Sequence, residues 1–298
     1  MAAPEFPSMT GRVCIVTGAN SGIGKAIVRR LASLDATVVM ACRSLERGEA
    51  ARRELDAVTG NPKLAVLRVD LASLRSVRAF AEAFASRYPK LHVLVNNAGI
   101  YTSRRVLTED GVESTFQTNH LGHFLLTNLL LDTIRASAPS RIVNVASQAS
   151  RMGTVRFDDL NGERRWGGMA AYAQSKLANV LFTVELARRL DGAGVVANAM
   201  HPGVVRTAWA SKGGGLVAVG VRIGRPFMVS PAKGADTAFW LAASAEAATL
   251  SGQYLYKRRP IRGNPLIRDA GVARRLWGVS EELTGLRARG TPAAQLPT

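Results

Sequence analysis

Short apolar runs alternate along the chain with longer segments in which apolar residues recur every three or four positions. The apolar runs predict buried strands at residues 12–17, 36–41, 64–69, 91–96, 140–146, 194–200 and 252–256. The periodic segments predict helices at residues 22–34, 44–58, 73–88, 112–136, 169–191 and 231–244. Apolar strands separated by helices are typical of a parallel sheet that helices cover on both faces. We therefore predict an α/β fold with a doubly wound parallel sheet.

Length and composition indicate one domain. The 298 residues, 47% of them hydrophobic, suffice for one large core, and no linker or repeat divides them. The apolar runs are much shorter than the ~20 residues of a membrane-spanning helix. The start of the chain lacks the basic and apolar regions of a signal peptide. We expect a cytoplasmic protein with no integral membrane segment.

The chain is strongly basic: 39 Lys and Arg against 22 Asp and Glu give a net charge of +17. This balance occurs in proteins that bind nucleic acid, an anionic membrane or an anionic ligand. No nucleic-acid-binding module is visible, and aromatic residues make up only 6% of the chain. We interpret the charge as a solvated basic surface and predict no nucleic-acid partner. Contact with an anionic membrane stays open.

A glycine-rich turn, TGANSGIG at residues 17–24, follows the first predicted strand. Gly18 allows a tight turn, Gly22 lets the backbone approach a pyrophosphate, and Gly24 lets the next helix pack close to the strand. The N–H groups at the start of that helix, with the positive end of its dipole, would bind phosphate. The turn predicts a dinucleotide site formed by Gly18, Asn20, Ser21, Gly22, Ile23 and Gly24.

Two further predicted strands end in polar or small residues. The run Asn97, Ala98, Gly99 follows the fourth strand, and Ser147 follows the fifth. The carboxyl ends of strands in a parallel sheet line the ligand crevice. We therefore expect these residues to lie beside the dinucleotide site.

Tyr172 and Lys176 lie about one helical turn apart, so on a helix their side chains share a face. An ammonium near a phenol favours the phenolate. We therefore expect the pKa of Tyr172 to be lowered from ~10 toward neutrality, where the phenol exchanges protons with a substrate oxygen. The pair predicts a general acid/base, Tyr172, with Ser147 hydrogen-bonding the same substrate oxygen.

Together these motifs resemble the short-chain dehydrogenase/reductase family, and they run in its order over about residues 10–286. The matches are TGANSGIG at 17–24, Asp70-Leu71, Asn96 to Gly99, Asn119, Ser147, Tyr172, Lys176, Pro202-Gly203 and Thr207. An insertion at residues 150–168, the run at 119–127 and the ending at 276–283 resemble its retinol dehydrogenase-like branch. The resemblance implies a single-domain Rossmann fold over residues 1–298, with about seven strands in the order 3-2-1-4-5-6-7.

The resemblance also implies a reaction: hydride transfer between a nicotinamide and a carbonyl or alcohol carbon. Lys176 would bind the nicotinamide ribose as well as act on Tyr172. Asn119 would hold a water that connects Lys176 to bulk solvent, and Asp70 would accept a hydrogen bond from the adenine. The remaining cofactor contacts would come from Leu71, Asn97, Ala98, Gly99, Tyr172, Pro202, Gly203, Val205 and Thr207.

The end of the second predicted strand indicates which cofactor binds. An NAD-selective site has an Asp or Glu here for the ribose 2′-hydroxyl, whereas a positive charge favours a 2′-phosphate. This chain has Arg43 and Ser44, with Arg47 one helical turn later; the nearest acid is Glu46. We predict NADP(H) rather than NAD(H).

His120 and His123 are three residues apart on a predicted helix, but no third ligand with suitable spacing accompanies them. We interpret both as core histidines and predict no metal. The segment 208–231, rich in glycine and apolar residues, occupies the place of the family's substrate-covering segment. It favours an apolar carbonyl or alcohol as substrate.

Other readings stay open. The chain could be a non-catalytic nucleotide-binding scaffold, a peripheral membrane protein, or a reductase of carbon–carbon double bonds. Asn119, Ser147, Tyr172 and Lys176 together argue against a scaffold, which has no need of all four. The resemblance also implies a homodimer or a homotetramer.

Overall fold

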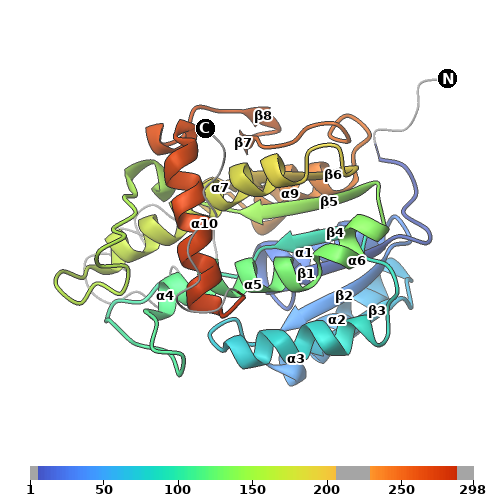
Figure 1. Ribbon diagram of the computed structural model, residues 1–298. Coiled ribbons are helices and arrows are strands. Elements are labelled where there is room, and N and C mark those ends of the chain that lie inside the picture. Colours follow the sequence, from blue (N-terminus) through green and yellow to red (C-terminus); the bar gives the residue numbers. More distant parts are fainter. Residues whose placement is uncertain (1–5, 206–228, 287–298) are drawn as a thin grey trace.

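Within residues 6–205 and 229–286, which the computed structural model describes, eight strands form one sheet in the order β3-β2-β1-β4-β5-β6-β7-β8 (Figure 1). The strands are β1 Val13–Thr17, β2 Thr37–Cys42, β3 Leu64–Arg68, β4 Val93–Asn96, β5 Ser140–Val145, β6 Val195–Met200, β7 Tyr254–Tyr256 and β8 Arg259–Pro260. Strands β1 to β7 are parallel, and β8 pairs antiparallel with β7. The predicted fold and strand order are confirmed, and β8 extends the sheet by one strand.

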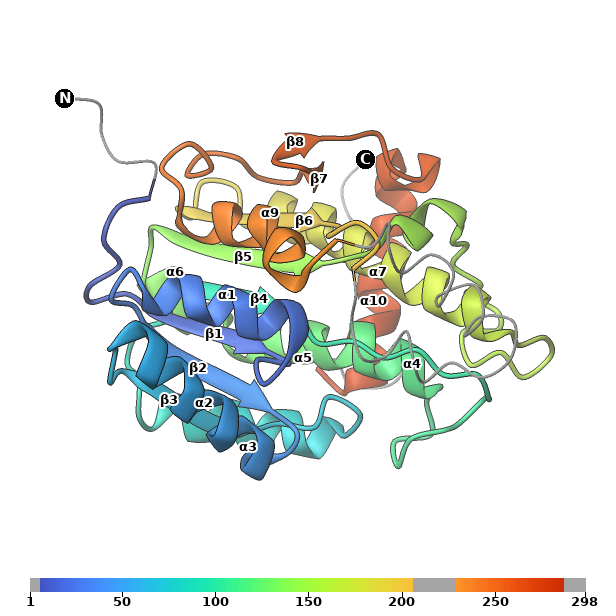
Figure 2. The same cartoon turned by 180° about the vertical axis from the view of Figure 1, so that it is seen from behind.

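Helices cover both faces of the sheet. One layer holds α1 Gly22–Ala32, α2 Leu45–Thr59 and α9 Pro231–Ala243 (Figure 2). The other holds α3 Leu74–Ala85, α5 Gly122–Leu129 and α7 Gly168–Arg189 (Figure 1). Successive β1 residues serve the two layers in turn: Cys14 and Val16 pack under the first, and Ile15 under the second. This double burial explains why the strands are apolar throughout.

A helix that the sequence pattern missed crosses the second layer. α10 Ala270–Thr284 packs against α7 (Figure 1). Its Trp277 contacts Phe182 of α7 at 5.7 Å between ring centroids, and it lies edge-on to Phe124 of α5 at 4.9 Å. Its end signals are present in the sequence. Asp269 accepts hydrogen bonds from the N–H groups of Gly271 and Val272, and Gly285 follows the helix with φ +65°. The short helices η2 Gln148–Met152 and η4 Pro265–Arg268 were also missed.

The predicted single helix at 112–136 is wrong in detail. The structure divides it into α4 Ser114–Phe116, the π-helical turn η1 Gln117–Leu121, α5 and α6 Leu131–Ala136. In η1 the N–H of Gly122 donates to the carbonyl of Gln117, one residue further back than in an α-helix. Apolar spacing cannot show one extra residue in a turn that is buried on every side. Such wide turns occur frequently at functional sites.

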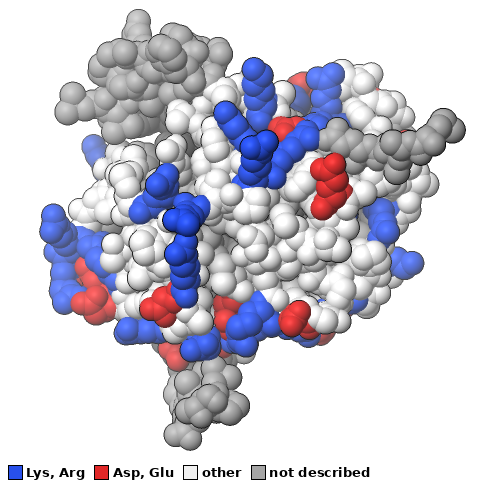
Figure 3. Space-filling view, turned by 90° about the horizontal axis from the view of Figure 1, so that it is seen from above, with Lys and Arg blue, Asp and Glu red and all other residues white. Residues whose placement is uncertain are grey.

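Lys and Arg side chains are spread over the face that Figure 3 shows. Lys233 on α9 and Lys257 and Arg259 at the β7–β8 turn are exposed. Beneath them Asp236 pairs with Arg30 at 2.9 Å and with Arg258 at 2.7 Å. No helix in the described part of the chain combines the length and the hydropathy needed to cross a membrane.

Replacing Phe124 by alanine tests the aromatic core of the second layer. Phe124 is fully buried and contacts the rings of Phe182 and Trp277. We expect Phe124→Ala to lower the free energy of unfolding by about 3–5 kcal/mol in urea denaturation. The control is Val58→Ala at an exposed position of α2, which should change it by less than about 0.5 kcal/mol. Equal losses in the two variants would contradict this account of the core.

Candidate active site

The glycine turn between β1 and α1 is held by close backbone contacts. Gly18 has φ +64°, and a Cβ at Gly24 would lie 2.4 Å from the Gly18 carbonyl oxygen and 2.6 Å from Asn97 Nδ2. Only glycine fits at residue 24. Ser21, the N-cap of α1, makes no capping hydrogen bond with its side chain. The first-turn N–H groups, with the positive end of the helix dipole, are thus available to a phosphate.

The loop after β4 is fastened to the end of β1. The N–H groups of Asn97 and Ala98 donate to Thr17 Oγ1 at 2.9 and 3.0 Å, and Asn97 Nδ2 donates to the Thr17 carbonyl at 2.8 Å. These bonds bring the glycine turn and the predicted residues Asn97, Ala98 and Gly99 together at the carboxyl edge of the sheet. Thr17 is fully buried. No sequence motif assigns Thr17 a role of its own.

The ends of β2 and β3 present the predicted adenosine-side residues. Arg43 is exposed directly after β2, and Ser44 accepts a hydrogen bond from the Arg47 N–H as the N-cap of α2. Asp70 does not cap α3, because Ser73 does so. One Asp70 oxygen accepts from the Ala72 N–H at 3.0 Å.

Ser147, Tyr172 and Lys176 converge where β5 ends and α7 begins. A hydrogen bond joins the Ser147 and Tyr172 side chains. Lys176 Nζ lies 5.9 Å from the centroid of the Tyr172 ring and donates to the Val145 carbonyl at 3.0 Å. α7 therefore carries the phenol and the ammonium on one face, as their spacing indicates. Tyr101, after β4, meets the Tyr172 ring edge-on at 6.1 Å between centroids.

The expected lowering of the Tyr172 pKa is wrong for this structure. Burial raises the pKa of the Tyr172 phenol, and the hydrogen bond from Ser147 only partly opposes that rise. Burial also lowers the pKa of Lys176, to about 8. Spacing alone showed the proximity of the two groups but not that the assembled fold buries Lys176 and leaves Tyr172 only partly exposed.

Asn119 lies in η1 and reaches across to the loop after β4. Its Oδ1 accepts from the Ile100 N–H at 2.7 Å, and its Nδ2 donates to the Ile100 carbonyl and to Ser175 Oγ, each at 3.0 Å. A Cβ at Gly99 would lie 3.2 Å from both Asn119 Oδ1 and Lys176 Nζ. Gly99 thus keeps open the space beside the ammonium.

The turn after β6 completes this edge. Gly203 has φ +77°, and Val205 forms a bridge with Val229. His201 stacks on Tyr256 at 4.3 Å between centroids, and both line a hollow of about 400 Å³ beside Pro202. Thr207 lies outside the described residues, as does most of the predicted substrate-covering segment 208–231.

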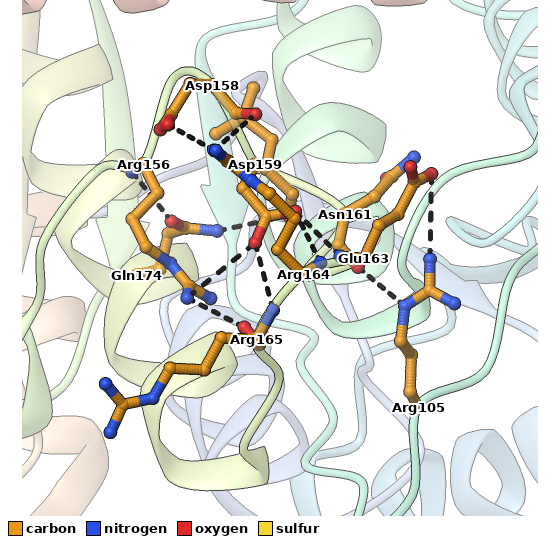
Figure 4. Close-up of polar contacts among 10 residues, drawn as sticks. Arg105, Arg156, Asp158, Asp159, Asn161, Glu163, Arg164, Arg165 and Gln174 are labelled. Carbon is orange, nitrogen blue, oxygen red and sulfur yellow. Dashed lines mark hydrogen bonds and ion pairs between the residues drawn. The ribbon is translucent and has the colours of Figure 1, made fainter.

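The insertion between β5 and α7 is organised around Asp159, which is almost buried (Figure 4). Its carboxylate accepts from the backbone N–H groups of Glu163, Arg164 and Arg165 at 2.7 to 3.4 Å. The carboxylate therefore closes the loop on itself. The arrangement is that of a structural cap and not of a paired acid–base site.

Gln174 attaches this insertion to α7. It lies between Tyr172 and Lys176 in sequence, accepts from the Arg156 N–H at 3.0 Å and donates to the Leu160 carbonyl at 3.2 Å (Figure 4). The insertion is thus fixed to the helix that carries the tyrosine. Gln174 was not predicted as a site residue, and neither was Tyr254, whose hydroxyl donates to the Ser147 carbonyl at 2.9 Å. No local motif marks either contact, because each partner is distant in sequence.

The two neighbouring histidines turn to different partners. His120 Nε2 lies 2.9 Å from Ser280 Oγ on α10, and His123 Nε2 lies 2.9 Å from Thr17 Oγ1. Burial lowers the pKa of His120 to about 3 and that of His123 to about 4. Within residues 6–205 and 229–286 no group of three or more His, Cys, Asp or Glu side chains could hold a metal ion.

A family model described as short chain dehydrogenase matches residues 12–213, which include the glycine turn, Ser147, Tyr172 and Lys176. The chain belongs to the short-chain dehydrogenase family. It is 44% identical over 277 residues to retinol dehydrogenase 12 of Mus musculus, covering 93% of this chain and 87% of the relative. It is also 44% identical over 302 residues to retinol dehydrogenase 13 of Homo sapiens, covering 99% and 91%. The resemblance to the retinol dehydrogenase-like branch is confirmed.

Solved structures of this short-chain dehydrogenase fold are similar along most of their length. An uncharacterised protein from Mycobacterium paratuberculosis gives a TM-score of 0.77 at 37% identity, covering 94% of this chain and 96% of that one. Pseudomonas aeruginosa RhlG, in a complex with NADP, gives 0.68 at 26% identity, covering 85% and 97%. The 3-ketoacyl-(acyl-carrier-protein) reductase of Brucella melitensis, in a complex with NADH, gives 0.66 at 25% identity, covering 83% and 97%.

Family membership establishes the general activity. This short-chain dehydrogenase is an oxidoreductase of alcohol and carbonyl groups that acts on small molecules with a nicotinamide cofactor.

Replacing Lys176 by methionine tests the cost of burying its ammonium. The pKa of about 8 lies below the ~10.4 of an unfolded lysine, so below pH 8 the folded state bears the whole desolvation penalty. We expect Lys176→Met to raise the free energy of unfolding at pH 7 by about 1–3 kcal/mol. The loss of the hydrogen bond to the Val145 carbonyl reduces this gain.

The advantage of Lys176→Met should shrink between pH 8 and about pH 10.4, because there the unfolded chain holds a proton that the folded wild type has released. Urea denaturation at pH 7 and pH 10 measures both effects, and the exposed Lys63→Met is the control. If Lys176→Met has a lower free energy of unfolding than the wild type at both pH 7 and pH 10, by the same amount, the desolvation account is refuted.

Proposed function

We propose that this chain transfers hydride between NADP(H) and the carbonyl or alcohol carbon of an apolar small molecule, with Tyr172 as general acid/base. The observation that carries the proposal is the hydrogen-bonded Ser147–Tyr172 pair, with the Lys176 ammonium 5.9 Å from the phenol ring. These groups lie at the carboxyl edge of the sheet, beside the glycine turn. Each has a task in the reaction that its surroundings support.

Tyr172 would exchange the proton with the substrate oxygen. Its raised pKa keeps the phenol protonated at neutral pH, which is the form that donates during reduction. Ser147 would hydrogen-bond the same oxygen and stabilise the charge that develops on it. Lys176 would attract negative charge on the phenol and bind the ribose in the space that Gly99 leaves open. The bound nicotinamide supplies or accepts the hydride.

Asn119 would hold its part of the site in place and connect Lys176 to solvent through a water. Both ends of its amide are used in bonds to Ile100 and Ser175, so its orientation is fixed. Its backbone lies in the π-helical turn η1.

The preference for NADP(H) rests on charge at the end of β2. Arg43 and Arg47 are exposed, and neither forms an ion pair with another described residue. Both guanidinium groups are therefore free to bind a ribose 2′-phosphate. Glu46 is exposed in the first turn of α2. Related structures contain either NADP or NADH, so the fold alone does not decide the cofactor.

An apolar substrate fits the rim of the site. Most of the large hydrophobic residues that are exposed in the described part of the chain follow strands β4, β5 and β6 or begin α7. They are Val106, Leu107, Met152, Met169 and Val204. Exposed apolar side chains on the connections that leave the carboxyl ends of the strands favour a ligand that buries apolar surface.

The cofactor preference is testable by thermal unfolding with NADP⁺, with NAD⁺ and without ligand. A cofactor at ~100 times its Kd adds about 2.7 kcal/mol to the free energy of unfolding, so we expect a clear rise in Tm with NADP⁺ and a small one with NAD⁺. Arg43→Asp should reverse this order. Arg53→Asp makes the same charge change at an exposed position on α2 and should leave the order unchanged. A larger effect of NAD⁺ on the wild type would overturn the NADP(H) proposal.

The role of Tyr172 is testable by removing its hydroxyl. We expect Tyr172→Phe to lower kcat for reduction of decanal by NADPH about 10²–10⁴-fold, because the proton donor is lost. Its Kd for NADPH, from fluorescence titration, should stay within about threefold of the wild type. Tyr101→Phe removes a hydroxyl from the neighbouring ring and is the matched control. A Tyr172→Phe enzyme that keeps a tenth or more of the wild-type kcat would exclude Tyr172 as the acid.

A further inference from the structure

The buried His123 bridges two parts of the site that are far apart in sequence. Its ring lies on α5, and its Nε2 is 2.9 Å from Thr17 Oγ1 at the end of β1. Its Nδ1 is 3.0 Å from the carbonyl oxygen of Asn119, one turn earlier. The side chain is 1% exposed, so water does not compete for either nitrogen.

The partners fix the position of the ring proton. The Asn119 carbonyl can only accept, so Nδ1 carries the hydrogen. Burial lowers the pKa of His123 to about 4, which leaves Nε2 without a proton at neutral pH. Nε2 therefore accepts from the Thr17 hydroxyl.

The direction of that bond determines what else Thr17 can bind. With its one hydrogen directed at His123, Thr17 Oγ1 has both lone pairs left for the N–H groups of Asn97 and Ala98 at 2.9 and 3.0 Å. The alternative acceptor for the hydroxyl, the Val95 carbonyl, is more distant at 3.4 Å. A neutral His123 thus orients the hydroxyl that holds the loop after β4.

At its other nitrogen His123 acts on Asn119. The bond from Nδ1 holds the carbonyl within η1, while the Asn119 amide spans to Ile100 and Ser175. One chain of hydrogen bonds then runs from the loop after β4, through Thr17 and His123, to Asn119 and α7. The predicted cofactor loop and the predicted proton path share one buried ring.

We propose that His123 is a positioning residue that holds the loop Asn97–Gly99 and the residue Asn119 in a single arrangement through its two ring nitrogens. The part of the proposal that concerns catalysis rests on the function proposed above for Asn119. The neighbouring His120 is equally buried but bonds to Ser280 on α10, outside this chain of bonds.

Two amide substitutions separate the two bonds. In His123→Asn the short amide reaches the place of Nδ1, so it can donate to the Asn119 carbonyl but cannot reach Thr17. In His123→Gln the longer amide reaches the place of Nε2, so it can accept from Thr17 but leaves the Asn119 carbonyl without its donor. His120→Gln is the matched control.

The readouts are Kd for NADPH by fluorescence titration, kcat for decanal reduction, and hydrogen–deuterium exchange of the backbone. We expect His123→Asn to raise Kd about tenfold, the effect of one hydrogen bond, with faster exchange at residues 97–99 and kcat within about threefold of the wild type. We expect His123→Gln to lower kcat about tenfold, with faster exchange at residue 100 and at residues 117–121 and Kd within about threefold. His120→Gln should change neither constant more than about threefold.

Equal effects of both substitutions on both constants, or no effect of either, would show that His123 only fills space and would overturn the proposal. If the wild type binds no NADPH or reduces no decanal, the proposed function fails while the exchange measurement still tests the bridge. If both variants then exchange at residues 97–100 and 117–121 at the wild-type rate, that result alone would overturn the bridge.

Discussion

A layer of buried polar groups at the carboxyl ends of the strands is the constraint on which the site depends. Thr17, Asn96, Asn144 and Thr183 are almost wholly removed from water. A buried polar group without a partner costs about 1–3 kcal/mol, so hydrogen bonds inside the protein stabilise these side chains, although Asn96 Oδ1 has no partner among the described residues. Asn96 Nδ2 donates to Asn144 Oδ1 at 2.8 Å, and Asn144 Nδ2 donates to Thr183 Oγ1 on α7 at 2.8 Å. These bonds fix β4, β5 and α7 relative to one another.

A buried lysine, Lys176, lies beside this layer. The Lys176 ammonium is buried and donates a hydrogen bond to the Val145 carbonyl. Placing it there lowers its pKa and opposes folding, so packing elsewhere must offset the cost. The aromatic contacts of Phe124, Phe182 and Trp277 lie on the same face of the sheet and supply such packing. α7 therefore carries both Phe182, which contributes to this packing, and Lys176, whose burial the packing offsets.

Much of the fold could be predicted from the sequence, because strands that are buried on both faces appear in it as continuous apolar runs. The glycine turn, Ser147, Tyr172 and Lys176 are also recognisable, since their chemistry allows few other residues. The π-helical turn at Asn119 and the helix α10 were missed for different reasons. The spacing of apolar residues does not distinguish a π-helical turn from an α-helical one. α10 has recognisable end residues, Asp269 and Gly285, but a prediction based on apolar spacing alone does not use them.

The contacts that position the candidate catalytic groups were the least predictable part. Gln174, Tyr254 and His123 each join segments that are distant in sequence, and an amide, a phenol or an imidazole has no pattern that reveals its partner. The pKa of Tyr172 belongs to the same class, because it depends on how completely the surrounding elements exclude water. Sequence spacing gives the distance between two charges, while the assembled fold decides how far each is desolvated.

Burial of both groups has a consequence for the direction of proton transfer. Desolvation raises the pKa of the phenol and lowers that of the ammonium, so it favours the neutral form of each. A neutral phenol can donate, whereas oxidation of an alcohol needs a phenolate that a charged Lys176 must stabilise. If Tyr172 exchanges the proton as we propose, raising the pH disfavours Lys176 charge just as it begins to favour the phenolate. These surroundings therefore suit donation to a carbonyl oxygen at neutral pH better than removal of a proton from an alcohol.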